Sequence, residues 1–259
     1  MENPNSLTLH AGDATNGTLY FTLFEGEADA ALMNVVCFDA FVVGNHEFNN
    51  GDQGLVTFLD YLKEGSCQTP VLGANVQPEV GISPLAKSSR DDYIQPYTIV
   101  ERNGEKIGII GIVISKKTKM SSNPDDKTMF LDEVTTAQKY ADELNSQGVE
   151  RVILLSHYGY ENDLALAQKT SGIDIIVGGD SHSLLGDLSD LGLKPNGSYP
   201  TMVSDASGND VCVVTAWEYS QIVGELHAEF DGQGNITSCM GTPHMMLADS
   251  FKRKNADGE

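Results

Sequence analysis

Four short, mostly apolar segments of this chain each run directly into a cluster of glycine and polar residues. The segments are Leu7–Ala11, Phe41–Val43, Val152–Ser156 and Ile175–Val177, and the clusters that follow them are Gly12–Asp13, Gly44–Glu47, His157 and Gly178–His182. Short apolar runs bounded by turn residues are typical of buried strands in a parallel sheet. In such sheets, ligands bind in the crevice beyond the carboxyl ends of the strands. We therefore expect the four clusters to meet at one edge of an α/β fold.

The rest of the chain alternates between predicted helices and strands and ends in strands. Predicted helices span residues 27–36, 55–62, 133–145 and 161–168, and further strands are predicted at 71–74, 97–101, 106–114, 211–216, 223–230 and 236–239. Residues 115–126 are rich in Ser, Lys and Asp and are predicted to form a loop. This order of elements predicts an α/β sandwich.

The charge balance excludes one large class of partner. Acidic residues outnumber basic ones by 37 to 16, which gives a net charge of -21. Nucleic acid is not an expected partner, because phosphate backbones are bound by clustered Lys and Arg. No apolar run reaches the length of a transmembrane helix, and the first residues lack the character of a signal peptide. The four cysteines form no CxxC pair, which leaves both free thiols and disulfides open.

Taken singly, the polar clusters have ordinary structural explanations. A Gly-Asp pair such as Gly12–Asp13 is usually a turn, and a histidine at a strand end is usually held by hydrogen bonds in the core. Asn45, His46 and Glu47 are less ordinary, because three polar side chains directly after a buried strand need compensating partners. Together the clusters bring carboxylate, amide and imidazole groups to one edge. That mixture suits zinc, manganese or iron better than calcium.

The order and spacing of these motifs resemble the calcineurin-like metallophosphoesterases, within them the branch of 5'-nucleotidases, UDP-sugar hydrolases and 2',3'-cyclic-nucleotide phosphodiesterases. The resemblance implies a four-layer α-β-β-α sandwich over residues 1–246. The family pattern opens with a strand that carries Asp-x-His, and no such motif precedes Gly12 here. We therefore expect a catalytic domain that lacks its first strand. Residues 247–259 are expected to be a charged tail, or the start of a linker to a C-terminal nucleotide-binding domain absent from this chain.

The resemblance also implies two divalent metal ions, which would be Zn, Mn, Mg or Fe. Asp13 would bridge both metals, Asn45 and His157 would complete the second site, and His182 would bind the first. Asp180 stands where the family has a histidine, and a carboxylate there can still bind a metal and would favour harder cations. The first site is expected to be incomplete without the Asp-x-His strand.

Two residues are assigned to catalysis on the same resemblance. His46 would lie over the reacting phosphate and stabilise or protonate the leaving oxygen. Asn49 occupies the position where many nucleotidases have an aspartate that orients this histidine, whereas the cyclic-nucleotide phosphodiesterases have asparagine. An amide cannot stabilise an imidazolium ion as a carboxylate does.

The expected function is therefore metal-dependent hydrolysis of nucleotide phosphoesters by an activated water, as in a 5'-nucleotidase. Two alternatives stay open at this stage. One is a non-catalytic fragment or truncated gene model that keeps a single metal site, and the other is a cyclic-nucleotide phosphodiesterase or a thiosulfohydrolase-like member. The expected substrate is a nucleotide or a small phosphoester. By resemblance, the parent protein is expected in the periplasm or outside the cell.

Overall fold

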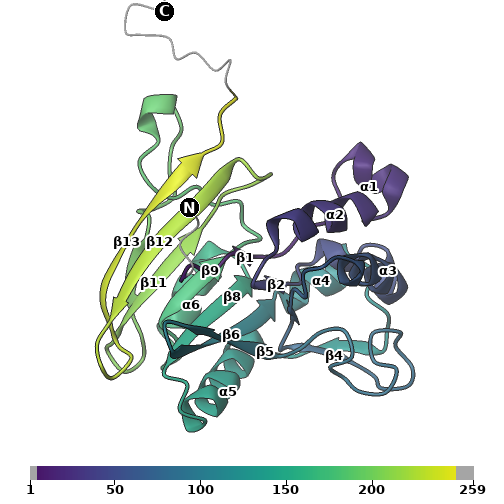
Figure 1. The fold of residues 1–259 in the computed structure, drawn as a ribbon, viewed down its shortest axis with the longest axis horizontal. Helices are drawn as coiled ribbons and strands as arrows, with labels where there is room; N and C mark the ends of the chain where they lie inside the picture. Colours follow the sequence, from purple (N-terminus) through teal and green to yellow (C-terminus); the bar gives the residue numbers. More distant parts are fainter. Residues whose placement is uncertain (1–4, 249–259) are drawn as a thin grey trace, which may run out of the picture.

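Two stacked β-sheets form the centre of the fold, which we describe from a computed structural model covering residues 5–248 (Figure 1). The first sheet is parallel and has the order β1 (Leu9–His10), β2 (Ala40–Val42), β3 (Val71–Leu72). The second is mixed and has the order β10 (Thr201–Ser204), β11 (Asp210–Thr215), β9 (Ile175–Gly178), β8 (Arg151–His157), β6 (Glu105–Val113), β5 (Tyr97–Arg102). Its inner strands β11, β9, β8 and β6 run parallel, so their carboxyl ends lie at one edge.

Three apolar layers hold the sheets and helices together. Between the sheets, Val42 and Leu72 belong to the same buried cluster as Ile153 and Leu155. Outside the first sheet, residues of α2 (Glu27–Val36) and α3 (Gly51–Glu64) pack with Phe41. On the outer face of the second sheet, α5 (Glu133–Ser146) packs against β6 and β8, and α6 (Tyr160–Ala167) packs against β9 and β11. Helix, sheet, sheet and helix thus form four layers, which confirms the expected sandwich.

The smaller elements complete the edges of this sandwich. They are α1 (Leu19–Phe24), η1 (His46–Phe48), β4 (Val76–Pro78), α4 (Ser115–Ser121), β7 (Thr128–Phe130), η2 (Ser189–Leu191), β12 (Ile222–Phe230) and β13 (Ile236–Met245). The long β12–β13 hairpin, drawn in yellow-green, stands on the opposite side of Figure 1 from α1 and α2.

Most predicted elements are confirmed, and the helix predicted at residues 27–36 matches α2 in both bounds. The loop predicted at 115–126 is wrong, because its first half is the helix α4. That helix carries no apolar stripe and is fixed by tertiary contacts instead. The Ser115 N–H donates to the Glu133 carboxylate at 2.6 Å, and Thr118 is fully buried. The short helix α1 was also not predicted; its Thr18 cap accepts the N–H of Phe21.

Two disulfides resolve the question that the cysteine count left open. Cys37 pairs with Cys67, and Cys212 pairs with Cys239. The second bond joins β11 of the large sheet to β13 of the hairpin. A disulfide typically stabilises a fold by about 2–4 kcal/mol.

Within residues 5–248, no helix has the length and apolarity needed to cross a membrane. The tail predicted from residue 247 lies, apart from residues 247 and 248, outside the described residues.

Gly111 on β6 marks a place where the two sheets come too close for a side chain. A Cβ atom there would lie 2.4 Å from Leu72 Cβ and 2.8 Å from the Leu72 carbonyl carbon. We expect Gly111→Ala to lower the free energy of unfolding by about 1–3 kcal/mol, the usual cost of overpacking. Gly232→Ala is the matched control, since nothing lies within 4 Å of a Cβ at that turn. Urea denaturation of both variants measures the difference, and equal stabilities would contradict the close sheet contact.

Candidate functional site

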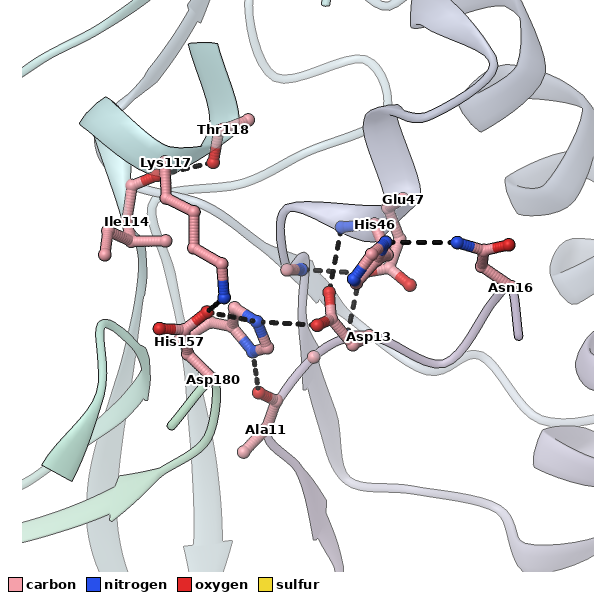
Figure 2. Close-up of polar contacts among 12 residues, drawn as sticks. Ala11, Asp13, Asn16, His46, Glu47, Ile114, Lys117, Thr118, His157 and Asp180 are labelled. Atoms are coloured by element: carbon pink, nitrogen blue, oxygen red, sulfur yellow. Dashed lines mark hydrogen bonds and ion pairs between the residues drawn. The ribbon is translucent and has the colours of Figure 1, made fainter. Parts of the chain in front are cut away.

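The four polar clusters meet at one edge of the sandwich, as the sequence predicts (Figure 2). Asp13 follows β1 and His46 follows β2, both in the first sheet. His157 ends β8 and Asp180 follows β9, both in the second sheet. The site is therefore assembled from both sheets, and each contributes strand ends.

His157 is the residue that joins the two halves. Its Nδ1 lies 2.6 Å from the carbonyl oxygen of Ala11 and can only donate there, so the neutral ring carries its proton on Nδ1. In that neutral ring Nε2 carries no proton and donates no hydrogen bond, although it lies 3.0 Å from Asp13 Oδ2 and 3.6 Å from Asp180 Oδ1. Burial alone would lower the pKa of His157, but the hydrogen bond that a protonated Nε2 donates to Asp13, together with the negative charge of Asp13, raises the pKa to about 9. The ring is thus held where a positive charge is favoured.

Asp13 and Asn45 complete this cluster. Asp13 Oδ1 accepts the backbone N–H of His46 at 2.9 Å, and Asp13 Oδ2 faces His157. Burial acts to raise the pKa of Asp13, but His157 and the His46 N–H together hold it below its usual value. Asn45 is fully buried, and its amide meets Asp180 Oδ1 at 3.2 Å when Nδ2 faces that oxygen.

Glu47 ties the loop after β1 to the loop after β2. Its buried carboxylate accepts the N–H groups of Gly44 at 2.6 Å, Asp13 at 2.9 Å and Thr15 at 3.1 Å. Burial raises the pKa of Glu47 to about 7, and the charge of Asp13 acts in the same direction. These hydrogen bonds fix the position of Asp13 against His46.

Close approach at the site depends on two glycines. A Cβ at Gly12 would lie 2.5 Å from His157 Nδ1, and a Cβ at Gly44 would lie 2.2 Å from Asp13 Oδ1. Two of the polar residues themselves are strained, since Asp13 has φ 55° and Asp180 has φ 68°. Left-handed backbone in non-glycine residues is uncommon and concentrates at functional sites.

Lys117 brings a second cationic side chain to the cluster. It extends from α4 to form an ion pair with Asp180 Oδ1 (Figure 2). The Asp180 side chain is only 9% exposed, whereas that of Lys117 is 41% exposed. Sequence reasoning missed Lys117, because it lies in the segment predicted to be a loop.

His46 lies beside this polar cluster and faces two amides. Its Nδ1 is 2.9 Å from the side-chain nitrogen of Asn49 and 3.1 Å from that of Asn16. Where these amides donate, the ring proton sits on Nε2 and is available to a substrate oxygen. A cavity of about 430 Å³ adjoins His46, and Phe21 and Phe58 also line it.

His182 is not brought to this cluster. Its Nδ1 pairs with Glu218 at 3.0 Å, and its ring lies edge-on to Tyr219 at 5.3 Å. The side chain is about half exposed. Its assignment to the first metal therefore stays a prediction.

The chemistry of Asp13, Asn45, His157 and Asp180 fits one divalent metal ion. The unpartnered Nε2 of His157 points between two carboxylate oxygens, a setting that a cation satisfies. The Asn45 amide lies beside Asp180 Oδ1; with Nδ2 toward that oxygen it is satisfied by hydrogen bonds, and in the opposite orientation it would present its carbonyl oxygen to a cation. These four side chains contact one another directly. Within residues 5–248, no group of three or more His, Cys, Asp or Glu side chains is already arranged to hold a metal ion.

Two residues besides Lys117 were missed as site components. Glu47 belongs to the Gly44–Glu47 motif, and its burial after an apolar strand is a usable signal. Asn16 carries no comparable signal, since its contact with His46 depends on how the loop after β1 turns.

Comparisons with known proteins agree with this geometry. The sequence profile of the family described as calcineurin-like phosphoesterase matches residues 2–184. A probable 5'-nucleotidase of Treponema pallidum (strain Nichols) is 48% identical over 259 residues, which is 99% of this chain and 42% of that protein. The structure of the Haemophilus influenzae NAD nucleotidase has a TM-score of 0.88 at 42% identity and covers 98% of this chain and 48% of its own. A 5'-nucleotidase precursor from Thermus thermophilus has a TM-score of 0.85 at 40% identity, covering 93% and 45%.

The chain spans about two fifths of the length of the curated relatives that it matches. The match nevertheless extends over most of this chain and includes the strand ends that carry the polar cluster. We conclude that this chain belongs to the calcineurin-like phosphoesterase family.

Proposed function

We propose that this chain is the catalytic domain of a metal-dependent hydrolase that cleaves phosphate esters of nucleotides. The observation that carries the proposal is the convergence of Asp13, Asn45, His157 and Asp180 beside His46, at one edge of two sheets. The relatives named as 5'-nucleotidases and NAD nucleotidase support nucleotides as the substrate class.

Each side chain has a defined task in this proposal. Asp13, Asn45, His157 and Asp180 would hold the second metal, and Asp13 would share the first metal with His182 if that side chain left Glu218. When bound, such ions clamp a phosphate and lower the pKa of a water that attacks it. His46 directs Nε2 at the leaving oxygen and gives it a proton, while Asn49 and Asn16 hold the ring in place through Nδ1. Zinc, manganese, magnesium and iron are the candidate ions.

The parent protein is proposed to act in an oxidising compartment such as the periplasm or the cell exterior. Both disulfides of the fold support this location, since such bonds are rare in the cytosol. Selection of the nucleoside is proposed to depend on a further domain in the parent protein, because the relatives are more than twice as long.

One prediction of the proposed function concerns His46. After loading with Mn²⁺ or Zn²⁺, we expect the protein to hydrolyse AMP, UDP-glucose or 2',3'-cyclic AMP. His46→Ala should lower kcat by about 10²–10⁴-fold, the usual contribution of a general acid. Its metal content, measured by mass spectrometry, should equal that of the wild type, since His46 binds no metal in the proposal.

The control is His227→Ala. It removes an exposed imidazole on β12 that pairs with Glu225 and is not one of the cluster residues. Loss of metal from the His46→Ala variant would contradict the role given to His46. Absence of hydrolysis of every ester by the metal-loaded wild type would favour a non-catalytic fragment.

The second prediction concerns Glu47. Glu47→Gln places an amide NH₂ against backbone N–H donors, so one or more of these buried groups loses its acceptor. We expect a loss of about 1–3 kcal/mol of stability per unsatisfied group, together with weaker metal binding as Asp13 shifts. Glu64→Gln, at an exposed position of α3, is the control. Unchanged melting and metal affinity in Glu47→Gln would show that these hydrogen bonds do not position the site.

A further inference from the structure

Lys117 places a positive charge where the proposed metal site has its own carboxylate. The ammonium group pairs with Asp180, whose side chain is almost fully buried (Figure 2). A lysine ammonium is a compact point charge on a flexible stem, so it can hold this position or withdraw from it. The exposed part of the Lys117 side chain leaves room for such a withdrawal.

All the contacts of Asp180 with the cluster use a single oxygen atom. Oδ1 pairs with Lys117 Nζ, lies 3.6 Å from His157 Nε2 and would accept from the Asn45 amide at 3.2 Å when Nδ2 of that amide faces it. Oδ2 faces away, toward Gly159, where a Cβ atom would lie 3.4 Å from it. The oxygen that would bind the second metal is therefore the one that Lys117 already occupies.

The position of Lys117 is set by an anchored helix. Ser115 at the start of α4 donates its N–H to Glu133 at 2.6 Å, and Thr118, also on α4, is buried and bonds to the carbonyl of Ile114. Lys116, the preceding residue on the same turn, is exposed. Of the two adjacent lysines, Lys117 therefore contacts the cluster and Lys116 faces solvent.

We infer that Lys117 is a built-in counter-cation that competes with the second metal for Asp180 and so sets the affinity of this site for divalent ions. The inference rests on the proposed metal site. It gives a functional reason for the ion pair between Asp180 and Lys117. The carboxylate adds negative charge to the site, and the lysine offsets it when no metal is bound.

The test is a titration of metal-stripped protein with Mn²⁺, followed by calorimetry and by the loss of the free-ion EPR signal. Lys117→Met keeps the aliphatic stem and removes the charge, and Lys117→Gln is a second, polar variant. Lys116→Met makes the same charge change at the exposed neighbour. Asp180→His removes the contested carboxylate and is combined with Lys117→Met.

We expect Lys117→Met and Lys117→Gln to bind Mn²⁺ at least tenfold more tightly than the wild type. Lys116→Met should stay within twofold. In the Asp180→His background, Lys117→Met should change the affinity less than threefold, because no carboxylate remains to be contested.

Several outcomes would overturn the inference. Unchanged or weaker binding in both Lys117 variants would do so, as would an equal gain in the Lys116 control or in the Asp180→His background. A higher KM with unchanged Mn²⁺ affinity would make Lys117 a contact of the substrate phosphate instead. Absence of Mn²⁺ binding in every variant would overturn the metal site itself, which separates failure of the proposed function from failure of this inference alone.

Discussion

The site depends on one buried imidazole that connects the two sheets. His157 ends a central strand of the large sheet, and its Nδ1 is tied to the Ala11 carbonyl, next to the strand end of the small sheet. This bond fixes the proton on one nitrogen and turns the other toward Asp13 and Asp180. A ring that was free to rotate would offer its lone pair in no fixed direction. The proposed metal site depends on this single constraint.

Space for that imidazole requires glycines at two positions and unfavourable backbone conformations at two others. Gly12 and Gly44 leave out the side-chain atoms that would collide with His157 and Asp13. Asp13 and Asp180 take up left-handed backbone, which is uncommon for residues with a side chain. Glu47 offsets part of this cost through its three backbone hydrogen bonds. Rigidity at the site is thus built from the loops and not from the strands alone.

The sequence predicted most of the strands, most of the longer helices and the cluster, because each left a local signal, whereas the short strands β4, β7 and β10 were not predicted. Apolar runs ending in glycine and polar residues located Asp13, His157 and Asp180, and apolar periodicity located α2 and α5. Helix α4 could not be predicted in this way, since it has no apolar stripe and is held by Glu133 from another element. Lys117 was missed for the same reason.

Two further features depend on contacts between distant segments. The pairing of Cys212 with Cys239 requires that β13 of the hairpin pack against β11 of the large sheet. The partner of His182 is set by the loop between β11 and β12, which carries Glu218 and Tyr219.

The proposed function requires a divalent metal held by His157 between Asp13 and Asp180. Anomalous diffraction at the manganese edge, from crystals of the protein grown with Mn²⁺, tests this claim most directly. The account predicts a peak within bonding distance of His157 Nε2 and Asp13 Oδ2. No peak there, or a peak only at the exposed Glu225–His227–His244 group on the hairpin, would contradict it.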